Sequence, residues 1–156
     1  MDIRIAELRD LDALLEHDRH IARARLERKI EEGQVLVLLD GENFAGWLRW
    51  GLFWDEHPFM NLLYLLEPYR GKGLGRELVT DWENRMKAAG HDVVMTSTQA
   101  NECAQFFYRR LGYEDAGAFA LPGDPLELIL QKALQSPKTQ RPSSLLKGRR
   151  LCVLEY

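Results

Sequence analysis

The amino-acid sequence predicts a mixed α/β (α+β) domain in which helices cover the faces of a β-sheet. Short stretches with apolar residues at every second position alternate with longer stretches whose apolar residues recur every three or four positions. In chain order they indicate a strand, two helices, three strands, a helix, a strand, a helix and two final strands. The 156 residues are 46% hydrophobic and 29% charged, which is typical of a single globular domain.

The N-terminal part predicts one short strand and two helices. Ile3 and Ile5 alternate with polar neighbours, as in a half-buried strand. Asp10 precedes an apolar run and is the predicted cap of the first helix. Residues 20–32 predict the second helix, because apolar side chains recur at every fourth position, at Ala22, Leu26 and Ile30.

Three strands are predicted next. Residues 35–39 are continuously apolar, Asp40-Gly41 is a strong turn signal, and residues 44–52 complete a hairpin. The third strand covers residues 59–66 and stops before Pro68.

The remaining elements alternate between helix and strand. Residues 74–89 are the clearest predicted helix, with apolar residues three or four positions apart and Gly90 at the end. A strand at residues 93–97 precedes a helix that Asn101 is predicted to cap and Gly112 to end. Strands at residues 113–120 and 126–132 complete the domain.

The predicted domain comprises residues 1–134, and residues 135–156 form a basic, linker-like tail that could add one strand. The tail contains five bases and one acid, which leaves 16 bases and 23 acids, a formal charge of −7, to residues 1–134. Nucleic-acid binding needs clustered Lys and Arg, so this acidic body is not expected to bind nucleic acid. Its charge mildly favours cationic substrates such as amines.

Features of membrane, secreted and metal-binding proteins are missing from the sequence. The apolar runs are too short to span a bilayer, and the N-terminus lacks a basic start followed by an apolar stretch. Cys103 and Cys152 have no metal-like spacing, and His17 and His20 have no partner at such a spacing. We therefore expect a cytoplasmic protein without a metal or a membrane partner.

A glycine-rich turn before the clearest helix carries the main functional signal. Residues 69–76 read YRGKGLGR, with no Ser, Thr, Asp or Asn to cap the first N–H groups of the helix. The glycines allow a ligand to approach the main chain closely. Arg70, Lys72 and Arg76 add positive charge where the helix dipole is already positive. Such a site favours an anion, and a pyrophosphate would satisfy the free amides.

Two common phosphate-binding motifs do not fit this turn. The P-loop requires Gly-Lys-Ser/Thr five residues after its first glycine, and no such triplet follows Gly71. The dinucleotide fingerprint G-x-G-x-x-G fails because Arg76 occupies the place of the third glycine.

The pattern that fits is Arg/Gln-x-x-Gly-x-Gly/Ala, met by Arg70, Gly73 and Gly75. It resembles the coenzyme A pyrophosphate loop of the GNAT acetyltransferase superfamily. Residues 101–113, NECAQFFYRRLGY, resemble the Asn…Ala…Phe-Tyr…Leu-Gly-Phe/Tyr helix of that family. In element order the resemblance covers residues 1–134. One departure is Pro68, which stands one place later than in the usual Asp/His-Pro-x-x-Arg strand exit.

The resemblance implies a mostly antiparallel sheet of six or seven strands, flanked by about four helices and splayed at its central strands. It also implies acetyl-CoA as co-substrate and acetyl transfer to a primary amine by direct attack in a ternary complex. The implied cofactor-binding residues are Leu65 and Leu66 (main-chain groups toward the pantetheine arm), Arg70, Gly71, Lys72, Gly73, Leu74, Gly75 and Arg76 (pyrophosphate), and Asn101 (pantetheine arm).

Tyr108 resembles the family tyrosine that points at the coenzyme sulfur. As a general acid it would protonate the departing thiolate. Proton transfer from a phenol with a pKa of about 10 to a thiolate of about 8.5 is uphill by about 2 kcal/mol. Either the site shifts these pKa values, or Tyr108 stabilises the thiolate by a hydrogen bond alone. A third alternative is an aromatic side chain that only packs against Phe106 and Phe107.

A general base is harder to assign from the sequence. An amine with a pKa of about 10 must lose a proton before it attacks. Asp55 and Glu56, in the turn before the third strand, are the candidate bases, with His57 and Glu67 as further possibilities. A surface charge or a water relay would explain the same residues.

The acceptor is not identified by the sequence. A small-molecule amine or a protein amine would suit, and Trp54 with Phe59 could line its pocket or belong to the core. A non-catalytic acyl-CoA-binding or sensory module is the main alternative function. The last strands could form the edge of a homodimer.

Overall fold

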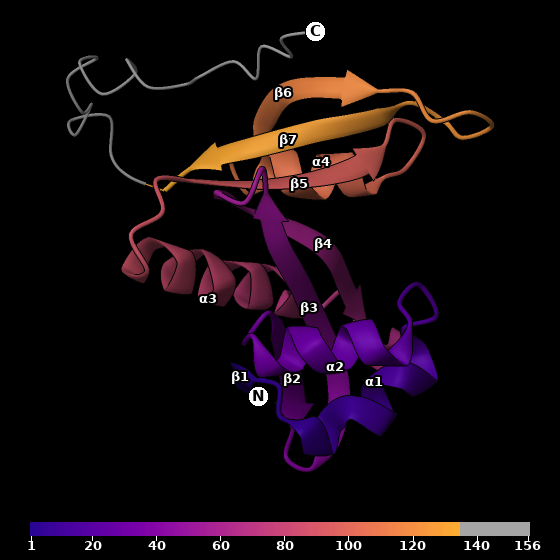
Figure 1. The fold of residues 1–156 in the computed structure, drawn as a ribbon, viewed down its shortest axis with the longest axis vertical. Helices are drawn as coiled ribbons and strands as arrows, with labels where there is room; N and C mark the ends of the chain where they lie inside the picture. Colours follow the sequence, from indigo (N-terminus) through magenta and orange to yellow (C-terminus); the bar gives the residue numbers. More distant parts are fainter. Residues whose placement is uncertain (135–156) are drawn as a thin grey trace, which may run out of the picture.

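A computed structural model describes residues 1–134 of the chain. Seven strands form one sheet in the order β1-β2-β3-β4-β5-β7-β6, as Figure 1 shows. The strands are β1 (Asp2–Ile5), β2 (Val35–Asp40), β3 (Asn43–Phe53), β4 (His57–Leu65), β5 (Val93–Gln99), β6 (Glu114–Phe119) and β7 (Glu127–Ala133). The helices are α1 (Leu11–His17), α2 (Arg23–Glu31), α3 (Leu74–Ala88) and α4 (Ala104–Arg110). The predicted fold class is confirmed.

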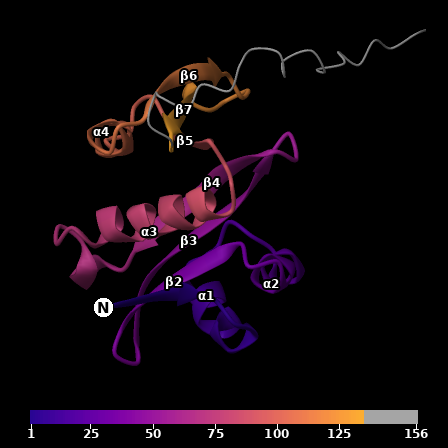
Figure 2. The same cartoon turned by 90° about the vertical axis from the view of Figure 1, so that its left-hand side faces the viewer.

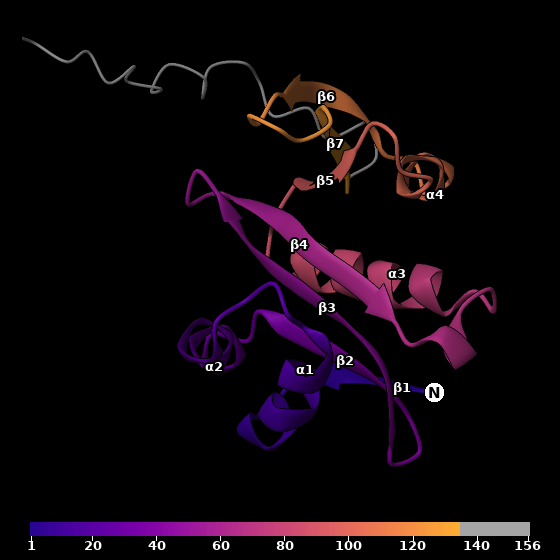
Figure 3. The same ribbon diagram turned by 90° about the vertical axis from the view of Figure 1, so that its right-hand side faces the viewer.

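Helices cover both faces of the sheet, so its central strands are apolar on both sides. In Figures 2 and 3, α1 and α2 lie on one face of β2, β3 and β4, and α3 lies on the other. Val35 and Val37 of β2 pack toward α1 and α2, whereas Leu36 and Leu38 pack toward α3. This explains the unbroken apolar run that the sequence shows here. Within residues 1–134, no helix is both long and apolar enough to cross a bilayer.

The sheet is split between β4 and β5. These strands are the parallel neighbours in an otherwise antiparallel sheet, and only Phe59↔Met95 and Met60↔Thr96 are paired. The split begins where β4 bulges: Arg49 and Trp50 of β3 oppose Leu62 and Met60, which leaves Asn61 as the extra residue. A bulge bends and twists its strand. The bend at Asn61 therefore turns the rest of β4 away from β5, as the predicted splay requires.

Two predicted helix starts are wrong, and a third helix begins where predicted, after Asp10, but lacks the predicted cap bond. The second helix begins at Arg23 rather than residue 20. The Asp10 carboxylate makes no cap bond to α1, because it accepts from the Glu7 N–H (2.7 Å) and from Arg4. Asn101 does not cap α4 either. A turn with Glu102 N–H donating to Gln99 O (3.0 Å) delays the helix, so that Cys103 takes the N-cap position.

A buried ion pair ties the loop after α1 to the sheet. The Asp18 carboxylate accepts from Arg49 Nε (3.0 Å) and Trp47 Nε1 (3.3 Å), and both partners of the ion pair are buried. Removing one partner leaves a buried charge without compensation. Asp18→Ala should therefore lower the free energy of unfolding by about 3 kcal/mol, measured by urea denaturation. Asp12→Ala, at an exposed ion pair with Arg23, is the matched control and should change it little. Equal effects of the two substitutions would contradict this assignment.

Candidate functional site

The start of α3 is an uncapped helix N-terminus, as the sequence predicts. Gly73 occupies the N-cap position with φ 85°, a left-handed conformation that favours glycine, and no side chain of residues 1–134 caps the helix. The following amides are those of Leu74, Gly75 and Arg76. They have no intrahelical acceptor and present a positive helix end to a ligand.

A cavity of about 500 Å³ opens at this helix start, between the end of β4 and α4. Eight of the residues predicted for the site line it: Leu65, Arg70, Gly71, Gly73, Leu74, Gly75, Arg76 and Tyr108. The cavity brings the glycine turn and the α4 tyrosine together, although 32 or more positions separate them in the sequence. These two motifs thus belong to one site.

Arg70 has a structural contact in addition to its place in the cavity. Its Nε donates to the Leu65 carbonyl (2.8 Å), and its guanidinium lies over the Tyr64 ring at 5.0 Å. Both contacts turn the glycine loop back onto the end of β4. The positive charge of Arg70 is therefore held at the mouth of the cavity.

The open edge of β4 includes Leu65 of the predicted pair but not Leu66. The main-chain groups of Leu66 are occupied, since its N–H donates to Ala45 O (2.9 Å) and its carbonyl accepts from Tyr69 N–H (2.9 Å). Its side chain does not line the cavity. Leu63 and Leu65 line it instead. Successive residues of a strand point their main-chain groups to opposite edges, so Leu63 and Leu65 face the gap that β5 leaves open.

Tyr108 is buried at the inner end of the cavity. Burial raises the pKa of its phenol, the charge of Glu102 adds to this, and a hydrogen bond with Thr96 acts in the opposite direction. The Thr96 hydroxyl donates to the Met60 carbonyl (3.1 Å), at the last residue of β4 that pairs with β5. The phenol therefore lies next to the point where the sheet splits.

The raised pKa of Tyr108 gives a pH prediction. At pH 10, where a free phenol is half ionised, the phenol of the folded protein is therefore still more than half protonated. A role as a hydrogen-bond donor should produce a fall in kcat of less than about twofold up to pH 10, measured as a pH–rate profile. An alkaline limb well below this pH that vanishes in Tyr108→Phe would contradict it.

The candidate bases Asp55 and Glu56 do not lie in this cavity. Both line a separate hollow with Gly90 and His91, which follow the C-terminal end of α3. The 15 residues of α3 separate that end from the glycine turn by about 22 Å. Turn geometry exposes both carboxylates, and Asp55 has a left-handed φ of 57°. The structure thus does not bring them together with Tyr108.

Two further predicted residues lie outside the cavity lining. Lys72 is exposed in the glycine turn, and Asn101 is exposed before α4. Their cofactor contacts stay predictions.

The sequence interpretation missed four lining residues: Leu63, Ala104, Phe107 and Arg110. Ala104, Phe107 and Tyr108 are three and four positions apart, so they share one face of α4. That spacing could have identified Ala104 and Phe107 once Tyr108 was a candidate.

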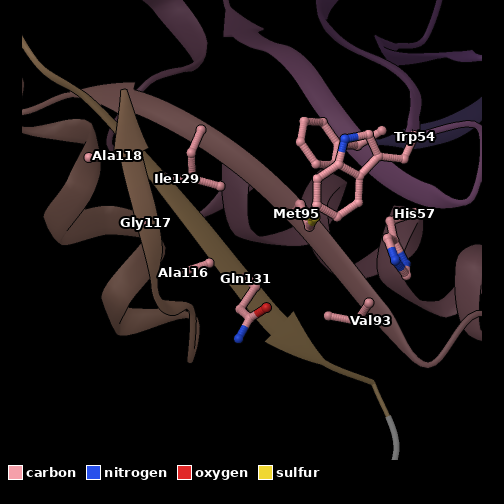
Figure 4. Close-up of a pocket in the computed structure, with 10 residues that line it drawn as sticks. Trp54, His57, Val93, Met95, Ala116, Gly117, Ala118, Ile129 and Gln131 are labelled. Atoms are coloured by element: carbon pink, nitrogen blue, oxygen red, sulfur yellow. The ribbon is translucent and has the colours of Figure 1, made fainter. Parts of the chain in front are cut away.

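A hollow of about 600 Å³ lies on another part of the sheet, beside the β3–β4 turn. Figure 4 shows Trp54 and His57 on one side of it and Ile129 and Gln131 of β7 on the other. Trp54 is 70% exposed and contacts Phe53, with ring centroids 4.6 Å apart. Trp54 is therefore a surface side chain and not part of the core.

The split sheet, with an uncapped and basic helix start at the opening, has the architecture of an acyltransferase that uses an acyl-coenzyme A. The family model described as the acetyltransferase (GNAT) family matches residues 4–113. The chain therefore belongs to the GNAT acetyltransferase family. No sequence match was found among curated proteins.

Solved structures with the same fold include several acetyltransferases. The ribosomal-protein-S18-alanine N-acetyltransferase of Escherichia coli is 17% identical, with a TM-score of 0.73 over 90% of this chain and 97% of the other. PaiA N-acetyltransferase of Thermoplasma acidophilum, in complex with coenzyme A, is 19% identical, with a TM-score of 0.71 over 85% and 98%. YncA of Salmonella typhimurium, with acetyl-CoA, is 21% identical, with a TM-score of 0.70 over 87% and 95%. At these identities the likeness establishes the fold alone.

Proposed function

We propose that this protein transfers the acetyl group of acetyl-CoA to a primary amine by direct attack in a ternary complex. The observation that carries the proposal is the cavity that joins the uncapped α3 start to the buried Tyr108. The diphosphate of the coenzyme would accept from the amides at Gly73–Arg76, with Arg76 adding positive charge. Coenzyme A and acetyl-CoA are named in the PaiA and YncA structures, which supports this choice of cofactor.

The pantetheine arm would run along the open edge of β4. Its amides can pair with the main-chain groups of Leu63 and with the N–H of Leu65, whose carbonyl already accepts from Arg70 Nε, as an added strand would. This path leads from the glycine turn toward Met60, where the Thr96 hydroxyl and Tyr108 lie. The thioester would then lie at the split of the sheet.

The chemistry at the split exchanges one acyl bond for another. The neutral amine nitrogen attacks the thioester carbon, the carbon–sulfur bond breaks, and the nitrogen loses one proton while the sulfur gains one. Tyr108 donates a hydrogen bond to the departing sulfur, because its raised pKa makes complete proton transfer less favourable. A water relay at the split would carry the proton from the nitrogen to the departing sulfur. Holding both reactants in one site supplies much of the acceleration.

Two measurements test this function. A thermal-shift titration with acetyl-CoA should stabilise the protein, by about 2.7 kcal/mol at a hundredfold excess over Kd. Release of free thiol should then depend on an added amine from a panel of polyamines, amino sugars, amino acids and peptides. Acetyl-CoA binding without thiol release for any amine would favour the binding or sensory module. Failure to bind acetyl-CoA would contradict both functions.

A further inference from the structure

A second cavity, of about 470 Å³, lies beside α2 and has a strongly basic lining. Four side chains that can carry positive charge line it: His20, Arg25, Lys29 and Arg49. Within the described part of the chain, no carboxylate lines this cavity. We call this the basic cavity. The concentration of bases is notable, because residues 1–134 have a formal charge of −7.

The bases of this cavity are only partly neutralised by neighbouring carboxylates. Arg49 pairs through Nε with buried Asp18 (3.0 Å). Lys29 donates to two neutral oxygens, Gln34 Oε1 (2.9 Å) and the Trp50 carbonyl. Within residues 1–134, Arg25 and Lys29 have no ion-pair partner among the contacts found. The cavity therefore retains positive charge that a ligand could neutralise.

The charges of Lys29 and Arg49 influence each other. Burial and the charge of Arg49 lower the pKa of Lys29, with a smaller contribution from Arg25, while Glu32 opposes the shift. This direction is expected where like charges gather without an anion. An anionic ligand would reverse the effect and stabilise the ammonium form of Lys29.

The basic cavity and the cofactor cavity share no lining residue, but strand β4 contributes residues to both of them. Phe59 and Asn61 of β4 line the basic cavity, and Leu63 and Leu65 line the cofactor cavity. Asn61 directly follows Met60, whose carbonyl binds Thr96 next to Tyr108. The two cavities lie on opposite sides of the sheet, since α2 covers one face and α3 the other (Figure 3). A ligand in the basic cavity could thus reach the split from the side opposite the coenzyme.

We propose that the basic cavity selects an acceptor amine that also carries an anionic group, a carboxylate or a phosphate. This inference rests on the proposed function and names the substrate class of its acceptor side. Arg25 and Lys29 would hold the anion, and the amine would point past Asn61 toward the split. The overall negative charge of residues 1–134 favours a cationic substrate. The positive charge of this cavity instead favours a substrate that carries an anionic group beside its amine.

The test compares pairs of acceptors that differ in the anion, with each rate referred to the concentration of neutral amine, because the anion also raises the pKa of the amine. One pair is an amino acid and its carboxamide, and the other is an aminoalkyl phosphate and the matching amino alcohol. With acetyl-CoA saturating, kcat/KM should be about tenfold higher for the anionic member of at least one pair. The pair that shows the preference identifies carboxylate or phosphate. Equal values within both pairs, or a preference for neutral members or polyamines, would overturn the inference while leaving acetyl transfer intact.

Arg25→Gln tests the assignment to this cavity. Arg25 is exposed on α2, so the substitution should not disturb folding. We expect KM for the anionic acceptor to rise about tenfold, whereas KM for the neutral acceptor of the same pair should stay unchanged. Arg28→Gln is the matched control, because Arg28 is also exposed on α2 but does not line the cavity. The proposal would be contradicted if KM rose equally for the anionic and neutral acceptors, or rose equally in Arg25→Gln and Arg28→Gln.

A binding measurement keeps the inference testable if no amine is acetylated. Calorimetric titration of the amino acid or the aminoalkyl phosphate into the coenzyme A-loaded protein should show binding that Arg25→Gln weakens and Arg28→Gln does not. No binding of either compound would reject the basic cavity as an anion site.

Discussion

Replacing Tyr108 by phenylalanine should lower kcat about 100-fold and leave the affinity for acetyl-CoA nearly unchanged. The substitution keeps the ring that packs against Phe107 and Tyr113 and removes only the hydroxyl. That hydroxyl remains protonated in its buried position, so it can donate to the sulfur as negative charge develops there. Steady-state kinetics with thiol detection and a calorimetric titration of acetyl-CoA would separate the two effects.

Tyr113→Phe is the control for this substitution. The Tyr113 ring lies 5.6 Å from that of Tyr108 between centroids, and Tyr113 is also buried, but it does not line the cofactor cavity. Its kcat should match that of the unaltered protein. A Tyr108→Phe variant with full turnover would show that the tyrosine only packs in the core.

Arg76→Glu should weaken acetyl-CoA binding about tenfold to 100-fold, the range expected when a charge-assisted hydrogen bond is lost. Arg76 is exposed in the first turn of α3 and lines the cofactor cavity. The new carboxylate would repel the diphosphate at the helix end that favours anions. Calorimetric titration gives the dissociation constant, which should also increase with salt concentration in the unaltered protein.

Lys87→Glu provides the matched charge change at the other end of the same helix. Lys87 is exposed in the last turn of α3, far from the glycine turn. The Lys87→Glu substitution should leave the dissociation constant for acetyl-CoA unchanged and lower the stability of the helix only slightly. If Arg76→Glu and Lys87→Glu weaken acetyl-CoA binding equally, the net charge of the protein rather than the start of α3 determines the affinity.

Most of the fold could be predicted because local signals agree with the final packing. The helix at residues 74–89 has a clear apolar face, and the structure places it at Leu74–Ala88. The apolar run at residues 35–39 becomes β2, which is buried on both faces. Helix starts were predicted less well. Asp10 and Asn101 are good capping residues, but hydrogen bonds from Glu7 and within the turn after β5 determine their conformation.

The site was predicted where main-chain geometry defines it, and missed where the tertiary structure does. The glycine turn follows from an uncapped helix start, which the sequence shows directly. In contrast, the open edge at Leu63 and Leu65 depends on the bulge at Asn61, which appears only when β3 and β4 are paired. Asp55 and Glu56 are predicted as bases from their residue type and their place in the turn before β4. The structure places them in a hollow beside the C-terminal end of α3, outside the cavity that Tyr108 lines.

The basic cavity shows why overall charge is a poor guide to a substrate. Arg25 and Lys29 lie on an amphipathic helix whose bases are expected to be solvated. Only the packing of α2 against β3 brings them beside Arg49 and Asn61.

The proposed function depends most on the free amides at the start of α3, which we expect to bind the diphosphate of the coenzyme. Amide chemical shifts in a ¹⁵N-labelled sample, titrated separately with coenzyme A and with pantetheine, test it most directly. We predict large downfield shifts of the Gly73, Leu74, Gly75 and Arg76 amide protons with coenzyme A and not with pantetheine, which lacks the diphosphate. Tight binding of coenzyme A that leaves these amides unshifted would contradict the account.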